Sequence, residues 1–334
     1  MEYNQRQIEQ WVRQHLVCPR DHQKLEWASD GRIVCARGHE YPLIDGVPIM
    51  LISDKSSTQE HIKGLTLSRA AGYKAAGGQE PVPENSDSID FYVKDVIGAT
   101  CGAMYNSLIG KLAKYPIPKF PLRTQQDKFL LDIGCNWGRW AIGAAMAGYS
   151  PVGIDHNLDA IFAARRVSGQ FNLAVYYLVA DARYLPFDSN IFDVVFSYSV
   201  LQHFSEEDLK LCLAESSRVM KSGGIGMFQM PNRFGLRNIF QQLKRVFKKR
   251  RSEFDVTYWD MRRLKNIFSR YLGKTVFIVD GFFSLNPQPS CVDILPRRYR
   301  LLIGLSESLK KISKKIKCIV VFADSLYVKS VKSE

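Results

Sequence analysis

Three apolar runs in the middle of the chain carry an acidic residue at or near their ends. Asp132 lies inside the first run, Asp155 ends the second, and Asp181 follows the third. The carboxyl ends of parallel strands meet at one edge of a sheet, where small ligands bind. There Asp155 can accept hydrogen bonds from two ribose hydroxyls, and Asp181 can accept one from an adenine amino group. Acidic strand ends in series favour an adenosine that carries a sulfonium over one that carries a pyrophosphate.

The segment after the first run has the residue types of a tight turn between a strand and a helix. Gly134 and Gly138 tolerate positive φ and a close ligand, and Asn136 is the non-glycine type that best tolerates the left-handed region. The N-terminus of the following helix can face a cofactor. The candidate cofactor-binding residues are Asp132, Gly134, Cys135, Asn136, Gly138, Asp155, His156, Asp181, Ala182 and Ser199.

Several segments, in order along residues 127–232, resemble class I S-adenosylmethionine-dependent methyltransferases. They are Leu131–Gly138, Gly153–Asp155, Asp181–Asp188, Phe192–His203 and Glu215–Gly224. The resemblance implies S-adenosylmethionine as the cofactor. It places the methionine portion against Asp132, Gly134 and Gly138, the ribose against Asp155, and the adenine against Asp181 and Ala182. Asn136 departs from the family pattern, in which this position is often glycine, and we expect cofactor binding to survive the change.

His203 is the candidate catalytic residue. Methyl transfer is an in-line displacement that depends mainly on proximity and alignment, and a hydroxyl acceptor also benefits from a general base. His203 follows the fourth expected strand, beside the position expected for the reacting methyl group. The alternative is that His203 only packs or forms hydrogen bonds. Tyr105 could also line the pocket, and Asn232, after the fifth strand, could touch the substrate.

Two pairs of possible metal ligands stand near the start of the chain. Cys18 is followed by Asp21 and His22, and Cys35 is followed by His39. Zinc takes four nitrogen, sulfur or oxygen ligands and can fold a segment that is too small to have a core of its own. The segment 35–51 resembles the zinc-ribbon-like activator domain of tRNA and protein methyltransferases. That family normally has a second cysteine where Asp21 stands, so the expected ligands are Cys18, Asp21, Cys35 and His39, with His22 as an alternative to Asp21. A module without metal, with both cysteines buried, is the other interpretation.

Strand-like and helix-like segments alternate from residue 129 to residue 230. This pattern predicts an α/β, Rossmann-like, doubly wound and mostly parallel sheet, and the resemblance implies seven strands. We expect a zinc-ribbon-like β module at 1–55, a linker at 56–90 and a methyltransferase domain at 91–334, with basic helical insertions within 234–318. In the tail, the ranges 236–251, 258–271 and 299–316 are predicted to be helical and 319–322 to be a strand.

The net charge of +13 is concentrated in the last third of the chain. Residues 234–334 carry 22 Lys and Arg against 8 Asp and Glu. Such an imbalance favours an anionic partner, although it is also typical of a solvated basic surface. Apolar stripes beside lysines at 236–247 and 302–316 suggest either packing onto the core, or a lid or docking surface for an anionic or lipid-linked acceptor, with peripheral membrane contact.

We therefore expect methyl transfer to a small-molecule, sugar or lipid-linked acceptor. One alternative is an RNA base methyltransferase that uses the ribbon and the basic tail to bind RNA, although few aromatic residues stand among these charges. Another is a non-catalytic module that docks a partner. No apolar run is long enough to span a bilayer, the first residues lack an apolar signal core, and the 7 cysteines are scattered. A cytoplasmic protein is expected.

Overall fold

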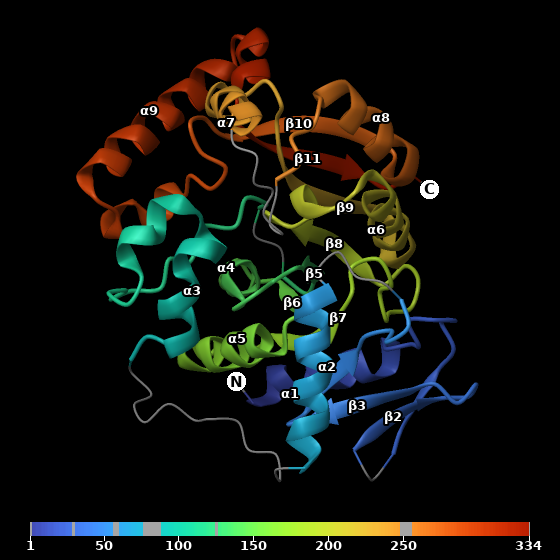
Figure 1. Ribbon diagram of the computed structural model, residues 1–334. Helices are drawn as coiled ribbons and strands as arrows, with labels where there is room; N and C mark the ends of the chain where they lie inside the picture. The colour runs from blue at the N-terminus through green and yellow to red at the C-terminus, as the bar shows by residue number, and fades with distance from the viewer. Residues whose placement is uncertain are drawn as a thin grey trace.

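The computed structural model describes residues 2–28, 31–55, 60–75, 88–123, 126–247 and 256–333. Within them one sheet has the order β1-β2-β3-β4-β7-β6-β5-β8-β9-β11-β10 (Figure 1). The strands are β1 (Leu25–Trp27), β2 (Arg32–Cys35), β3 (Glu40–Ile44), β4 (Val47–Met50), β5 (Phe129–Ile133), β6 (Ser150–Asp155), β7 (Tyr176–Ala180), β8 (Phe192–Ser197), β9 (Met220–Pro231), β10 (Lys274–Gly281) and β11 (Ser325–Val331). The α-helices are α1 (Glu2–His15), α2 (Glu60–Ala75), α3 (Phe91–Cys101), α4 (Arg139–Met146), α5 (Leu158–Gln170), α6 (Glu206–Val219), α7 (Leu236–Phe247), α8 (Met261–Leu272) and α9 (Arg297–Ser313).

The five strands β7, β6, β5, β8 and β9 are parallel neighbours, and β11 enters antiparallel between β9 and β10. The chain builds outward from β5 through β6 and β7, and then resumes with β8 on the other side of β5. This reversal is a topological switch point, where the carboxyl ends of the strands leave room for a ligand. The seven strands from β5 to β11 confirm the predicted Rossmann-like architecture.

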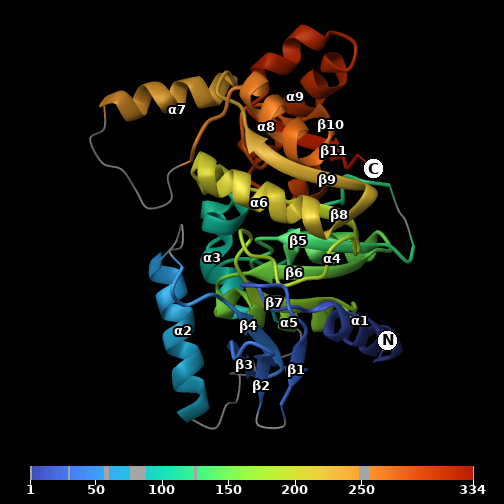
Figure 2. The ribbon, with the colours of Figure 1, turned by 90° about the vertical axis from the view of Figure 1, so that its right-hand side faces the viewer.

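Helices cover both faces of the parallel strands, which is why these strands read as continuous apolar runs. On one face α1, α6 and α8 pack into a large apolar core, and on the other face α4 and α5 cover β5, β6 and β7 (Figure 2). The side chains of Asn157, Ser205 and Asp260 accept hydrogen bonds from the first backbone N–H groups of α5, α6 and α8. These caps fix where each helix begins.

The N-terminal strands extend the central sheet instead of standing apart from it. β1 to β4 form antiparallel pairs, and β4 then pairs parallel with β7, with Ile49 opposite Val179. Trp11 of α1 stacks on Phe129 of β5 with 3.7 Å between ring centroids. The module therefore shares its packing with the domain that follows.

The structure differs from the sequence predictions in two places. Residues 60–75 of the expected linker form α2, whose Thr66 hydroxyl donates to the carbonyl of His156 at 2.9 Å. Residues 317–322 form a 3₁₀ helix, so the strand predicted at 319–322 is wrong. There the Asn232 side chain donates to the carbonyls of Val321 and Ala323, and these bonds override the strand preference of a β-branched run. The helix predicted at 236–251 is described as far as Phe247, and positions 248–251 lie outside the described residues.

Candidate active site

A cavity of about 810 Å³ opens at the carboxyl ends of the parallel strands. The ends of β5, β6, β7 and β8 supply one side, while α3, the segment 283–286, α7 and α9 supply the other. The predicted site residues that line it are Gly134, Asn136, Asp155, His156, Asp181, Ala182, Ser199 and His203. The switch point thus brings together residues that are up to 69 positions apart in the sequence.

The loop between β5 and α4 has the backbone that its residue types predict. Gly134, Asn136 and Gly138 have φ values of 71°, 46° and 80°. A Cβ atom on Gly134 would lie 2.3 Å from Val200 Cγ2, and one on Gly138 would lie 2.4 Å from the Tyr177 hydroxyl. Glycine is therefore required at both positions for conformation and for space. Asn136 adopts the left-handed backbone conformation and lines the cavity.

Asp155 is held in place by backbone donors. Its Oδ2 accepts from the N–H of Asn136 and its Oδ1 from the N–H of Asn157, both at 3.0 Å. A carboxylate has about four acceptor positions, so two bonds leave capacity on both oxygens. Because the side chain also lines the cavity, it can accept further hydrogen bonds from a ligand.

Asp181 is fixed by a buried arginine. Arg183 donates to both carboxylate oxygens of Asp181 and, at 2.6 Å, to Asp208. The Arg183 side chain is only 5% exposed, so this pair of bridges is shielded from water. Asp181 and Ala182 both line the cavity, with the arginine behind the carboxylate.

Asp132, Cys135 and Gly138 do not line the cavity. Asp132 is 1% exposed and accepts a hydrogen bond from the backbone of Ala141 in the first turn of α4. Burial raises the pKa of Asp132 to about 8. Its Oδ2 has no hydrogen-bond partner among the described residues. The geometry therefore ties β5 to α4 through Asp132 and does not bring this carboxyl to the cleft.

Two histidines face the cavity, as predicted. His203 lies in a 3₁₀ turn after β8, with its Nε2 3.2 Å from the side-chain nitrogen of Gln202. His156 places Nδ1 3.7 Å from Asp155 Oδ1, and its buried Nε2 has no partner among the described residues. Tyr105 and Asn232 do not line the cavity. Tyr105 bonds to Arg139, and Asn232 holds the 3₁₀ helix at 317–322.

Other lining residues were not predicted from the sequence. They come from α3 (Tyr92), from the loop after β10 (Phe283 to Asn286), from α7 (Arg237) and from α9 (Tyr299 and Leu302). The sequence analysis offered the tail helices as a surface for the acceptor, but no motif marks the individual positions that line the cleft. The far wall of the cavity is thus built by α3 and by the C-terminal part of the chain.

Four candidate metal ligands meet in the N-terminal module. The ligand atoms of Cys18, Asp21, Cys35 and His39 all lie within 4.8 Å of one another. Cys18 Sγ is 3.4 Å from His39 Nδ1, and that nitrogen is 3.4 Å from Asp21 Oδ2. His22 points elsewhere, with Nε2 3.7 Å from Glu215. Of the two alternatives left open by the sequence, the structure brings Asp21 into the cluster.

Comparisons with known proteins fall on the central strands. Residues 130–224 match the family described as "Methyltransferase domain". A malonyl-[acyl-carrier protein] O-methyltransferase of Hamiltonella defensa is 30% identical over 121 residues, which cover 36% of this chain and 45% of that protein. A ubiquinone biosynthesis O-methyltransferase of Pelagibacter ubique is 33% identical over 96 residues, covering 29% of this chain and 39% of that protein.

A phosphoethanolamine N-methyltransferase 2 of Haemonchus contortus, solved with S-adenosyl-L-methionine, is a structural neighbour. It has a TM-score of 0.46 and 17% identity, and the match covers 77% of this chain and 63% of that chain. The chain spans about half or less of the length of the curated relatives it matches.

Proposed function

From residues 130–224, which form a class I S-adenosylmethionine-dependent methyltransferase domain, we infer that the whole protein transfers a methyl group to a small-molecule or lipid-linked acceptor. One observation carries the inference. Asp155 and Asp181 face a single cavity at the switch point of the sheet, beside Gly134 and Asn136 of the turn after β5. This arrangement suits an adenosine that lies across the strand ends.

The residues of the cavity fit the cofactor. Asp155 retains acceptor capacity for ribose hydroxyls, and Asp181 with the N–H of Ala182 can bind the edge of an adenine. The buried oxygen of Gln202 and the buried Nε2 of His156 both belong to lining residues and have no partner among the described residues. S-adenosylmethionine, when bound, supplies an electrophilic methyl group. The chain supplies position, and His203 as a group able to accept a proton from a hydroxyl acceptor.

Calorimetry with S-adenosylhomocysteine tests the cofactor site. Asp155→Asn should weaken binding about 10- to 100-fold, because charge-assisted hydrogen bonds contribute about 1.5–3 kcal/mol. Asp293→Asn is the matched control, since Asp293 is exposed and does not line the cavity. Equal affinities for both variants would remove Asp155 from the cofactor site, and no binding by the wild type would remove the proposed function.

His203 is tested by turnover once an acceptor is in hand. His203→Gln should lower kcat about 100-fold at constant cofactor affinity and should flatten the pH dependence of kcat. A variant with full turnover would leave His203 a packing residue.

An exposed apolar and basic surface at the mouth of the cavity favours a lipid-linked acceptor. Leu236, Ile239, Phe240 and Leu243 share one face of α7 and are 39–56% exposed. Lys244 places its ammonium group 4.3 Å from the Phe240 ring centroid, and Arg237 of the same helix lines the cavity. Figure 2 shows α7 projecting from the body of the protein. Helices with such a composition bind the interface of anionic membranes. No helix in the described ranges is long and apolar enough to cross a bilayer.

Vesicle sedimentation tests this surface. We expect binding to vesicles with 30% phosphatidylglycerol and weaker binding to pure phosphatidylcholine. Phe240→Ser should raise the half-saturating lipid concentration about 10-fold or more, because a buried Phe contributes about 1.5–3 kcal/mol. Leu65→Ser is the control, since Leu65 is equally exposed at 51% but lies on α2. Indifference to lipid, with tight salt-dependent binding to RNA, would instead favour an RNA substrate.

We also propose that the cluster of Cys18, Asp21, Cys35 and His39 binds a structural zinc ion. Zinc–ligand bonds of about 2.0–2.3 Å imply tetrahedral edges of about 3.3–3.8 Å. The distances of 3.4 Å from Cys18 to His39 and 3.6 Å from Cys35 to Asp21 fall in this range. Such an ion would join the turn after α1 to the hairpin of β2 and β3.

Elemental analysis of the purified protein tests the zinc site. We expect one zinc per chain, lost in Cys35→Ser and kept in Cys318→Ser, because Cys318 is exposed and outside the cluster. A well-folded protein without zinc would refute this part of the proposal and leave the cofactor site unaffected.

A further inference from the structure

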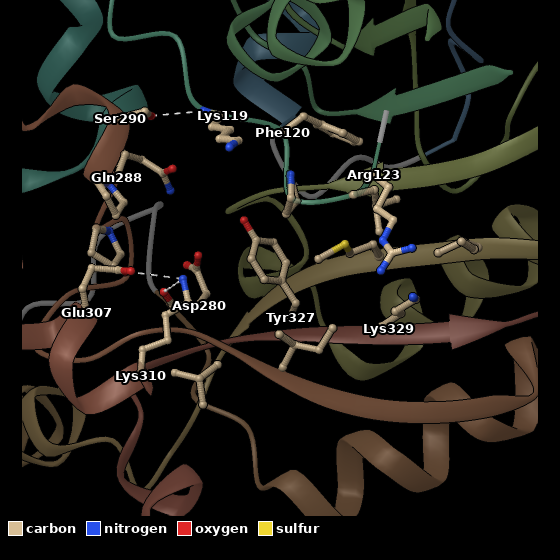
Figure 3. A pocket seen from close by; sticks show the side chains of 18 of the residues that line it. Lys119, Phe120, Arg123, Asp280, Gln288, Ser290, Glu307, Lys310, Tyr327 and Lys329 are labelled. Carbon is tan, nitrogen blue, oxygen red and sulfur yellow. Dashed lines mark hydrogen bonds and ion pairs between the residues drawn. The ribbon is translucent and has the colours of Figure 1, made fainter. Parts of the chain in front are cut away.

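A second cavity of about 820 Å³ lies on the face of the sheet that α4 covers. It spreads over β9, β10 and β11, beyond the edge of α4, and is closed by the segment 119–123, the loop 287–290 and α9 (Figure 3). Its floor is apolar and includes Met227, Ile278 and Tyr327. A concave apolar surface with a few polar groups is typical of sites for organic ligands.

Cations at the rim of this cavity are not balanced by acidic residues. The side chains of Lys119, Arg123 and Lys329 form no hydrogen bond or ion pair with any residue of the described ranges. In Figure 3 the Arg123 guanidinium and the Lys329 ammonium lie at the same end of the cavity, and the Lys119 ammonium points into it. Arg123 and Lys329 repel each other across the apolar floor, and an anion placed between these two side chains would be attracted by both.

The opposite end of the cavity is already neutralised. Lys310 lies 3.5 Å from Glu307 and donates to the carbonyl of Asp280 at 3.2 Å. Asp280 is 4% exposed and accepts hydrogen bonds at 2.6 Å from the hydroxyls of Tyr198 and Ser325. The free positive charge is therefore concentrated at the Arg123 and Lys329 end.

A buried wall separates this cavity from the cofactor cleft. Tyr198 lines the cleft, and its hydroxyl donates to Asp280 and accepts from Gln288 at 3.0 Å, while Asp280 and Gln288 line the second cavity. Tyr198, Asp280 and Gln288 are each at most 6% exposed. A ligand in the second cavity would therefore leave the methyl-donor cleft open and would touch the same hydrogen-bonded wall from behind.

We propose that this second cavity binds an organic anion with an apolar body, such as a medium-chain carboxylate, at a site separate from the cofactor and the acceptor. The apolar part lies on Met227, Ile278 and Tyr327, and the anionic group lies between Arg123 and Lys329. The inference does not depend on the methyltransferase activity, because none of these residues lines the cofactor cleft.

Calorimetry with decanoate below its micelle concentration tests the proposal, with decanol and inorganic phosphate as separate probes of the apolar and anionic parts. Decanoate should bind more tightly than either, and equally with and without saturating S-adenosylhomocysteine. If either decanol or phosphate bound as tightly as decanoate, the proposal would be overturned. Competition between decanoate and S-adenosylhomocysteine would do the same, because it would place both in one cleft.

Two pairs of variants locate the site. Arg123→Gln and Lys329→Gln should each weaken decanoate binding about 10-fold or more, while Lys274→Gln, an exposed lysine of β10 outside the cavity, should have no effect. Ile278→Asn should also weaken it, whereas Leu211→Asn should not, because Leu211 is similarly exposed but lies on α6, outside the lining. Decanoate affinity unchanged in Arg123→Gln, Lys329→Gln and Ile278→Asn would refute the site.

Discussion

Asp132 should make the stability of this protein depend on pH above the range where carboxyl groups normally titrate. Its side chain is 1% exposed, one of its oxygens lacks a partner among the described residues, and burial raises its pKa from 3.8 to about 8. The negative charge of Asp155 acts in the same direction. The folded protein therefore binds the Asp132 proton more tightly than the unfolded chain does.

The size of the effect follows from the two pKa values. Below pH 3.8 the group is protonated in both states, and its favourable contribution to folding is fully present. As the pH rises toward about 8, the unfolded chain releases the proton while the folded protein retains it, so stability falls by about 1.4 kcal/mol per pH unit. The loss is complete above the folded pKa and amounts to about 6 kcal/mol, since the pKa in the folded state lies about 4 pH units above that in the unfolded chain.

Urea unfolding of the wild type and of Asp132→Asn between pH 5 and pH 9 measures this loss. The amide of the variant is neutral throughout this range, and its oxygen can still accept from Ala141. The free energy of unfolding of Asp132→Asn should therefore rise relative to that of the wild type, by about 4 kcal/mol between pH 5 and pH 9. Asp293→Asn, at an exposed site, should run parallel to the wild type. Parallel curves for Asp132→Asn and the wild type would show that Asp132 is ionised in the folded state and would refute the reasoning.

Three further variants test the framework of the cleft. Gly134→Ala places a Cβ 2.3 Å from Val200 at a φ of 71° and should abolish measurable S-adenosylhomocysteine binding in calorimetry, whereas Gly304→Ala, with open space around it, should bind normally. Arg183→Gln removes the ion pairs with Asp181 and Asp208 at a side chain that is 5% exposed, and should lower the free energy of unfolding by about 3–5 kcal/mol. A change below about 1 kcal/mol in urea unfolding would contradict the shielding of these ion pairs from water. Trp11→Ala deletes the stack of this half-buried side chain on Phe129 and should lower the free energy of unfolding by about 1–3 kcal/mol; an unchanged melting temperature would show that α1 is not part of the core.

The local pattern of the sequence was enough to predict the parallel core. Runs such as 129–133 are apolar on both faces because helices cover both faces of the sheet. The alternation of strand-like with helix-like segments then leaves few possible sheet topologies. The glycines at 134 and 138 and the asparagine at 136 were predicted from backbone preference alone, and their positive φ values confirm it. Asp155, Asp181 and His203 were predicted from their positions at strand ends, and the structure places all three at one cavity.

Sequence position was a poor guide to the direction of a side chain. Asp132 precedes the loop and was expected to contact the cofactor, but it lies within β5, where successive residues alternate between faces. Its side chain is directed to the start of α4 instead of the cleft. The 3₁₀ helix at 317–322 was missed for a related reason, because hydrogen bonds from Asn232, about 89 residues earlier, override the local preference.

The sequence by itself determined the class of fold, the glycine-containing turn after β5 and the acidic strand ends, because these depend on residue type and on periods of two and 3.6 residues. Only the tertiary structure decided that Asp21 and not His22 joins the cysteine cluster, that α3, α7 and α9 build the far wall of the cleft, and that a cationic cavity lies behind Tyr198. These features depend on contacts between residues far apart in the chain, which no local pattern encodes.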